Sequence, residues 1–117
     1  MHEIYGLSDI GLRRTNNEDI FLSLPQLNFF ALADGMGGHK AGEIAAKEAV
    51  ADLSASAPTL MATNTLKDAI HNLYQAILRA NKKVYLLGRQ HASFHGMGTT
   101  LCCFCLFQQN KAIYAHV

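Results

Sequence analysis

The 117-residue sequence lacks any excess of charge, since 10 lysines and arginines stand against 9 aspartates and glutamates. A basic excess is typical of proteins that bind nucleic acids or anionic membranes, so we expect neither partner. A long apolar run is also missing, because the longest one, residues 101–107, is far too short to span a bilayer. The first residues do not show the basic and then apolar pattern of a secretory signal. We therefore expect a cytoplasmic protein.

Cysteine is scarce and confined to one short stretch, as Cys102, Cys103 and Cys105. An odd, clustered set is a poor framework for disulfides. Zinc is unfavoured as well, because strand alternation puts Cys103 and Cys105 on one face and Cys102 on the other. No second cluster supplies the missing ligands. We predict that these cysteines are small residues of the core.

Half of the residues are apolar, which suffices for the core of one globular domain. In the first part of the chain they predict strands over residues 3–9, 20–24 and 29–33. A polar turn over residues 11–19 separates the first two, and a tight turn at 25–28 joins the last two. Residues 29–33 form an unbroken apolar run, which is typical of a strand buried on both faces.

Two helices are predicted next. The first is alanine-rich and runs from Ala41 to about Leu53, and a linker over residues 54–65 follows it. The second is predicted from apolar residues at three- and four-residue spacing over six turns: Leu66, Ile70, Leu73, Ile77, Ala80, Val84 and Leu87. Thr65 and Asp68 resemble a capping box at its start, and Gly88 fits its end.

Two further strands are predicted over residues 97–107 and 111–117, joined by a turn at 108–110. The helices are therefore consecutive in the chain and do not alternate with the strands. This order predicts an α+β fold with a largely antiparallel sheet.

One carboxylate, Asp34, directly follows the apolar run and precedes Gly35, Gly37 and Gly38. A charge at the end of a buried strand needs a cationic or hydrogen-bonding partner, and glycines let backbone groups approach it. A plain Asp-Gly turn, or capping of the next helix by Asp34, are alternative interpretations. Nucleotide-binding loops are disfavoured, because Lys40 stands at the third glycine position of the dinucleotide pattern and no Gly-Lys-Ser/Thr ending is present.

A second polar group, Arg14, Glu18 and Asp19, precedes the predicted strand 20–24. If that strand pairs with the one before Asp34, then Asp19 and Asp34 come together. Clustered carboxylates commonly bind a hard divalent cation, and an arginine suits a phosphate oxyanion. The alternative is a local salt bridge between Arg14 and Glu18 beside a surface turn.

Taken together, these residues resemble the N-terminal part of PPM-type (type 2C) metal-dependent protein serine/threonine phosphatases, particularly the bacterial branch. Four stretches carry the resemblance in order: SDIGLRRTNNED, FFALADGMGGHKAGEIAA, GMGTTL and KAIYAHV. The fold it implies is the N-terminal half of a four-layer αββα sandwich, in which two antiparallel sheets are flanked by helix pairs.

The resemblance implies dephosphorylation of phosphoserine and phosphothreonine proteins with two Mn²⁺ or Mg²⁺ ions. Asp34 would bridge the ions, and the Gly35 carbonyl would ligate one of them. Glu18 and Asp19 would hold metal-bound waters without ligating the ions themselves. Arg14 would bind the substrate phosphate. The implied partners are a phosphorylated protein substrate and a cognate serine/threonine kinase.

Two features depart from the family pattern. Met36 stands where many eukaryotic members carry a histidine, and His39, three residues on, is not assigned that role. The sequence also stops at Val117, before the family's Gly-Asp-Ser-Arg segment and its C-terminal metal-binding aspartates. We therefore expect residues 1–117 to be a truncated domain, active only as part of the complete one. The alternative is a non-catalytic remnant or interaction module, and in either case residues 101–107 are expected at an open sheet edge.

Overall fold

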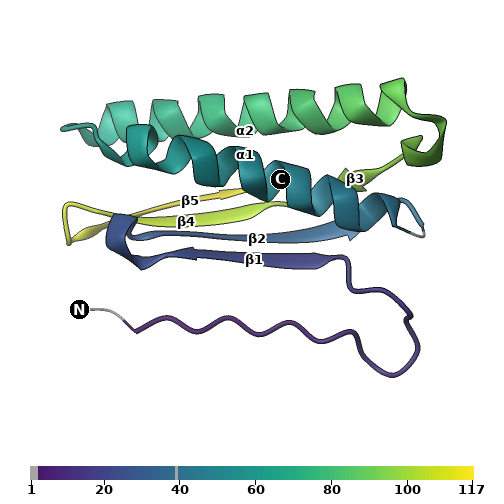
Figure 1. Ribbon diagram of the computed structural model, residues 1–117. Coiled ribbons are helices and arrows are strands. Elements are labelled where there is room, and N and C mark those ends of the chain that lie inside the picture. The colour runs from purple at the N-terminus through teal and green to yellow at the C-terminus, as the bar shows by residue number, and fades with distance from the viewer. Residues whose placement is uncertain (1–2, 39) are drawn as a thin grey trace.

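The computed structural model describes residues 3–38 and 40–117. In that part of the chain, one antiparallel sheet is covered on one face by two helices, α1 (Ala41–Met61) and α2 (Leu66–Gln90) (Figure 1). The strands follow the order β1 (Asp19–Leu24), β2 (Phe29–Met36), β4 (Cys102–Phe107) and β5 (Lys111–His116), and the short β3 (Gly98–Thr99) pairs with the end of β2. The predicted α+β class with an antiparallel sheet is confirmed.

The hairpin of β1 and β2 confirms the two strands predicted there. A 3-10 turn, η1 (Pro25–Leu27), joins them, and Asn28 closes it in the left-handed conformation with φ of 51°. β2 is longer than predicted, because Asp34, Gly35 and Met36 continue the strand instead of beginning a loop. The prediction of burial on both faces is met only in part: on the face turned away from the helices Phe30 is 6% exposed, whereas Leu32 is 47% exposed.

Helix α1 is also longer than predicted, since it continues through Pro58 to Met61. The segment 54–65 is therefore mostly helical and not a linker. Ala57 and Leu60, on either side of the proline, are buried in the core. Packing of these side chains favours a continued helix more strongly than Pro58 disfavours it.

Helix α2 begins where the sequence predicts. The Asp68 N–H donates to Thr65 Oγ1 at 3.1 Å, and the Thr65 hydroxyl donates back to the Asp68 carboxylate at 2.7 Å. The helix passes through Gly88 and ends at Gln90, two residues beyond the predicted glycine end. Its buried stripe is narrower and richer in alanine than the apolar pattern predicts, and comprises Ala69, Leu73, Ala76, Ala80 and Val84. Neither α1 nor α2 has an apolar stretch long enough to cross a membrane.

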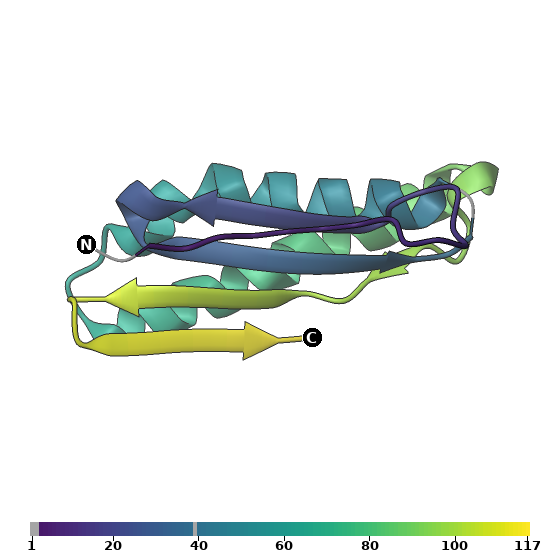
Figure 2. The same ribbon diagram turned by 90° about the horizontal axis from the view of Figure 1, so that it is seen from below.

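The core lies between the sheet and the helix pair, and Phe29, Leu53 and Cys105 are its largest fully buried side chains. The opposite face of the sheet, seen in Figure 2, we call the open face. It carries partly exposed apolar side chains from each long strand: Phe21, Leu32, Phe104 and Tyr114.

The strand predicted over residues 3–9 is not present. This segment runs extended beneath β1 and β2 on the open face (Figures 1 and 2) without strand pairing. Gly6 lies on the ring of Phe21, because a Cβ added to the glycine would stand 2.0 Å from ring carbons. The segment therefore contacts the sheet through side chains and not through a backbone ladder.

The strand predicted over residues 97–107 is split into β3 and β4. β4 lies between β2 and β5, so residues 101–107 are inside the sheet, and their predicted place at an open edge is wrong. The strand predicted over residues 111–117 is confirmed as β5. In the described residues the sheet ends at β1 on one side and at β5 on the other.

Candidate functional site

Two carboxylates meet at one end of the β1–β2 hairpin. Asp19 is the first residue of β1, and its Cα partner across the ladder is Asp34 of β2. Their neighbours Ile20 and Ala33 face the helices, and strand side chains alternate, so both carboxylates lie on the open face. The predicted juxtaposition of Asp19 and Asp34 is therefore present in the structure.

The surroundings of Asp19 disfavour its charged form. Burial raises the pKa of the Asp19 carboxyl, and a hydrogen bond with Asp34 and the charge of Asp34 raise it further. The guanidinium of Arg14 acts in the opposite direction, and the charge of Glu18 adds to the rise. Among the described residues, Asp19 Oδ1 is buried and has no hydrogen-bond partner. A buried carboxylate oxygen without a partner beside a second carboxylate is suited to a cation.

The backbone of Asp34 is held by Thr100. The Asp34 N–H donates to Thr100 Oγ1 at 3.2 Å, and the Thr100 N–H donates to the Asp34 carbonyl at 2.8 Å. One residue further along β2, Gly35 pairs with Thr99 of β3. The GMGTTL stretch thus fixes the end of β2, a role that the sequence analysis did not assign to Thr100.

The glycines after β2 turn the chain toward α1. Gly37 and Gly38 have positive φ angles of 132° and 71°, so the turn needs the freedom of glycine there. His39 lies outside the described residues. The interpretation of Asp34 as a helix cap is not supported, because Lys40 is the cap residue of α1 and no side-chain cap bond is present there.

Glu18 stands beside this pair of strands. Its carbonyl accepts a hydrogen bond from the Gly35 N–H at 3.0 Å. Its carboxylate lies against Gly42 in the first turn of α1, where a Cβ added to the glycine would come within 2.7 Å of Glu18 Oε2. The residue therefore contacts both the end of β2 and the start of α1.

Arg14 lies on the loop that leads into β1. Together with Arg13, Thr15, Asn16 and Glu18 it lines an open hollow of about 270 Å³. In the part of the chain that the structure describes, no ion pair joins Arg14 to Glu18, so the predicted alternative of a local salt bridge is not observed. The guanidinium is exposed and near enough to Asp19 to lower the pKa of that carboxyl.

The loop itself is ordered by the side chain of Asn17. Its amide donates to Ser8 Oγ at 2.8 Å, and its carbonyl oxygen accepts from the Asp19 N–H at 3.0 Å. These bonds tie the segment before β1 to the strand that carries Asp19. The turn over Asn16 and Asn17 is thus part of the framework of the site.

A metal ion would find hard oxygen donors here. Within residues 3–38 and 40–117, no three His, Cys, Asp or Glu side chains gather closely enough to form a metal site by themselves. The donors that come together are the carboxylates of Asp19 and Asp34, and Gly35 follows Asp34 directly along β2. Carboxylate and carbonyl oxygens suit Mg²⁺ or Mn²⁺, which complete their coordination with water, and do not suit a structural zinc.

The cysteines take no part in this site. Cys103 and Cys105 are buried in the core as predicted, and burial raises the pKa of each thiol to about 12. Cys102 is exposed on the open face. A thiolate nucleophile is therefore not available from the two buried cysteines near neutral pH.

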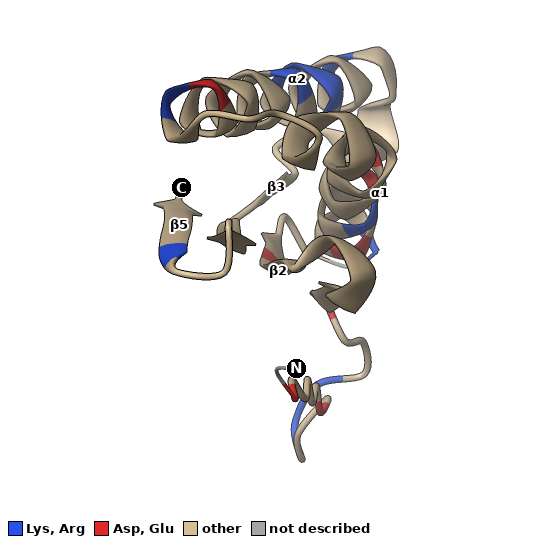
Figure 3. Cartoon of the chain, turned by 90° about the vertical axis from the view of Figure 1, so that its left-hand side faces the viewer, with Lys and Arg blue, Asp and Glu red and all other residues tan. Residues whose placement is uncertain are grey.

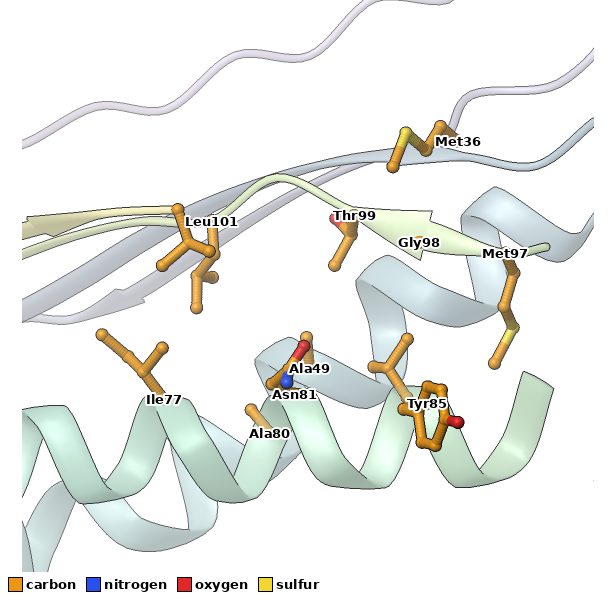
Figure 4. Close-up of a pocket in the computed structure, with 12 residues that line it drawn as sticks. Met36, Ala49, Ile77, Ala80, Asn81, Tyr85, Met97, Gly98, Thr99 and Leu101 are labelled. Atoms are coloured by element: carbon orange, nitrogen blue, oxygen red, sulfur yellow. The ribbon is translucent and has the colours of Figure 1, made fainter. Parts of the chain in front are cut away.

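An apolar pocket of about 230 Å³ lies between β3 and α2 (Figure 4). Met36, Ile77, Tyr85 and Met97 are among its lining residues, and none of the residues that line it is charged. In Figure 3 several Lys and Arg segments lie along α2, one layer away from the acidic segment of β2. The residues that line this pocket therefore offer no cationic partner to a phosphate.

No family model matches the chain, but individual proteins do. Protein phosphatase PhpP of Streptococcus pneumoniae is 37% identical over an alignment of 122 positions, which covers 98% of this chain and 47% of that protein. A putative protein phosphatase of the 2C type from Streptococcus pyogenes is 39% identical over 113 residues, covering 94% and 45%. The chain thus spans a little under half the length of these relatives.

Solved structures of serine/threonine phosphatases match the fold of this chain. The serine/threonine phosphatase PstP/Ppp of Mycobacterium tuberculosis matches with a TM-score of 0.80 at 33% identity, over 95% of this chain and 44% of that one. The serine/threonine phosphatase of S. agalactiae matches with a TM-score of 0.80 at 36% identity, over 95% and 46%. A structure of the PstP catalytic domain contains two manganese ions and matches with a TM-score of 0.79 at 33% identity, over 95% and 45%.

Proposed function

We propose that this chain, which belongs to the PPM-type serine/threonine phosphatases, supplies the metal- and phosphate-binding part of a site that dephosphorylates phosphoserine and phosphothreonine proteins. One observation carries the proposal: Asp19 and Asp34 face each other on the open face, and one buried carboxylate oxygen has no hydrogen-bond partner among the described residues. The two manganese ions in the structure of the related PstP domain support a divalent metal as the cofactor.

In this proposal, Asp34 and the Gly35 carbonyl hold the metal. Glu18 and Asp19 orient metal-bound waters, and the loop bonds of Asn17 keep Asp19 in place. Bound Mn²⁺ or Mg²⁺ would supply an acidified water and positive charge for the phosphoryl oxygens. Thr100 keeps the Asp34 backbone at its position through two hydrogen bonds.

Arg14 binds the phosphate of the substrate. Its planar guanidinium can donate two parallel hydrogen bonds to phosphoryl oxygens. It borders an open hollow, which leaves room for a protein substrate to approach. The charge of the guanidinium also offsets the negative charge that the carboxylates would otherwise present to an anionic substrate.

The test joins residues 1–117 to the part of the S. pneumoniae relative that this chain does not match. We expect Mn²⁺-dependent hydrolysis of p-nitrophenyl phosphate and of a phosphothreonine peptide. Asp34→Asn, a nearly isosteric change, should abolish this activity while the fold, followed by circular dichroism, stays intact. A chimera that folds and hydrolyses neither substrate, or an Asp34→Asn variant that keeps full activity, would contradict the proposal.

The second candidate is a non-catalytic remnant or interaction module. It is favoured by the absence, within the described residues, of a third metal-ligating side chain beside Asp19 and Asp34.

We propose that residues 1–117 by themselves are inactive and poorly soluble, because the open face leaves apolar side chains such as Phe104 and Tyr114 in contact with water. Expression of residues 1–117 and measurement of phosphatase activity and oligomeric state test this. A soluble monomer with Mn²⁺-dependent turnover would overturn it.

We further propose a cytoplasmic location and a cognate serine/threonine kinase as a partner. A phosphoprotein phosphatase needs a kinase to generate its substrate, which is the physical basis of the second proposal. Cell fractionation and phosphoproteome comparison of cells with and without the gene test these two proposals separately.

A further inference from the structure

Gly42 occupies a place in the first turn of α1 where there is no room for a side chain. A Cβ added to it would lie 2.7 Å from Glu18 Oε2, 2.8 Å from Glu18 Cδ and 2.8 Å from the Met36 nitrogen. Gly42 does not have a positive φ, so its backbone conformation would accept an alanine. Space excludes the side chain, and the Glu18 carboxylate occupies part of that space.

A second glycine faces Gly42 from β2. A Cβ added to Gly35 would stand 2.1 Å from the Gly42 carbonyl oxygen and 3.0 Å from the Glu18 carbonyl oxygen. The Gly35 N–H also donates to that Glu18 oxygen at 3.0 Å. The end of β2, the first turn of α1 and Glu18 are therefore in direct contact.

The contact is favourable electrostatically. α1 has 21 residues, and the start of a helix carries partial positive charge on its free N–H groups. Lys40, the cap residue, forms no side-chain cap bond to these groups. A carboxylate held against the first turn, such as that of Glu18, is stabilised there and loses part of its freedom to turn away from the site.

We propose that Gly42 is a positioning residue for the metal centre. Because Gly42 has no side chain, the Glu18 carboxylate can rest against α1 while the Glu18 carbonyl accepts from the Gly35 N–H, and Glu18 is thereby fixed at the end of β2. This inference rests on the proposed function, in which Glu18 orients a metal-bound water. It predicts that the effect of a side chain at position 42 passes through Glu18.

The test is a double-mutant cycle on Mn²⁺ affinity, measured by electron paramagnetic resonance of free Mn²⁺ with the metal-loaded chimera that contains residues 1–117. Gly42→Ala should raise the Mn²⁺ dissociation constant by about tenfold to a hundredfold, which is the usual range for groups that orient metal ligands. In a Glu18→Ala background the same substitution should change it by less than about twofold, since residues acting through one another are not additive. Gly88→Ala, also a glycine-to-alanine change inside a helix, is the matched control and should leave Mn²⁺ affinity unchanged.

A readout without metal separates this inference from the proposed function. The ¹³C shift of the Glu18 carboxyl should move in Gly42→Ala and stay in place in Gly88→Ala. If the native chain binds no Mn²⁺, the proposed metal centre is wrong, and the carboxyl shift still decides the role of Gly42. A Glu18 carboxyl signal that Gly42→Ala leaves unmoved would overturn the inference.

Folding gives the remaining check, because an added Cβ also approaches the Met36 nitrogen. If Gly42→Ala by itself does not fold, recovery of folding in the Glu18→Ala background supports the inference. Failure to fold in both backgrounds, or an equal loss of Mn²⁺ affinity in both, would place the conflict at the Met36 backbone and overturn it.

Discussion

Replacement of Asp34 by asparagine should stabilise the metal-free protein and remove its stabilisation by Mn²⁺. Asp34 lies directly opposite Asp19 across the β1–β2 ladder. Like charges directly opposite each other in a sheet destabilise it by roughly 0.2–1 kcal/mol. Asparagine keeps the shape of the side chain, removes one charge and can donate a hydrogen bond to the Asp19 carboxylate. We therefore expect the free energy of unfolding of the metal-free protein to rise by roughly that amount.

The repulsion between Asp19 and Asp34 should also make the stability of the metal-free protein depend on pH. Burial and the neighbouring Asp34 raise the pKa of Asp19 in the folded chain above its ordinary value of 3.8. An acid with a raised folded pKa prefers its proton in the folded state, so the metal-free protein loses stability as the pH rises through that raised pKa. The loss is absent below the ordinary value. In Asp34→Asn this pH-dependent loss should be smaller, because the charge of Asp34 no longer contributes.

Mn²⁺ should make the native protein more stable than the Asp34→Asn variant, the reverse of the order expected without metal. At a free concentration a hundred times its dissociation constant, a ligand that binds only the folded state adds about 2.7 kcal/mol to stability. This exceeds the gain expected from the substitution by about 1.7–2.5 kcal/mol, so native protein in Mn²⁺ should melt above the variant by about 7–10 °C, at roughly 4 °C for each kcal/mol.

Thermal denaturation followed by circular dichroism at pH 7.5, first with chelator and then with Mn²⁺, measures both effects. Asp9→Asn is the control, because Asp9 is an exposed carboxylate on the N-terminal segment. A metal-free Asp34→Asn variant that is less stable than the native protein would refute the assigned repulsion. An equal Mn²⁺-induced rise in both proteins would refute the assignment of Asp34 as a metal ligand.

Three further predictions concern Arg14, the cysteines of β4 and the cap of α2. In the chimera described above, Arg14→Ala should raise KM with little change in Mn²⁺ affinity, because an arginine that binds phosphate acts on the substrate; unchanged kinetics would remove Arg14 from the site. At pH 8 a thiol reagent should modify Cys102 and spare Cys103 and Cys105, whose pKa values are raised to about 12 by burial; reaction of all three thiols in the folded protein, measured by mass spectrometry, would contradict this. Thr65→Ala should lower the free energy of unfolding by about 1 kcal/mol through loss of the α2 cap, whereas Thr63→Ala, on the same connection, should have a smaller effect in urea denaturation; equal effects would contradict the role of the cap.

The elements that the sequence predicts well are those whose pattern is local. The α2 cap needs only Thr65 and Asp68, three residues apart, and both bonds are present. The turn between β1 and β2 is likewise contained in a few residues. The end of α1 is predicted too early because Pro58 and its polar neighbours indicate a linker, whereas burial of Leu60 in the core decides the outcome. That contact depends on residues that are distant in the chain.

The strand predicted over residues 3–9 fails for a related reason. Its composition permits an extended chain, and the segment is extended. A strand also needs a neighbour for its backbone hydrogen bonds, and the described residues provide only side-chain contacts such as that of Gly6 with Phe21.

In the candidate site, too, the features set by neighbouring residues are predicted from the sequence, and those set by distant residues are not. The juxtaposition of Asp19 and Asp34 follows from a hairpin register, which short-range pattern sets. Thr100 was missed because its bond to the Asp34 backbone joins residues 66 positions apart. Gly42 was missed because its role is to leave space for the Glu18 carboxylate, and a sequence does not show which atoms would fill that space.

Anomalous diffraction from crystals of the chimera that contains residues 1–117, grown with Mn²⁺ and recorded above and below the manganese absorption edge, tests the central claim most directly. We predict a manganese peak on the open face beside the Asp34 carboxylate and the Gly35 carbonyl, and its loss in crystals of Asp34→Asn. Manganese bound only elsewhere on the chain, or a peak at this place that persists in Asp34→Asn, would contradict the claim that this carboxylate holds the metal.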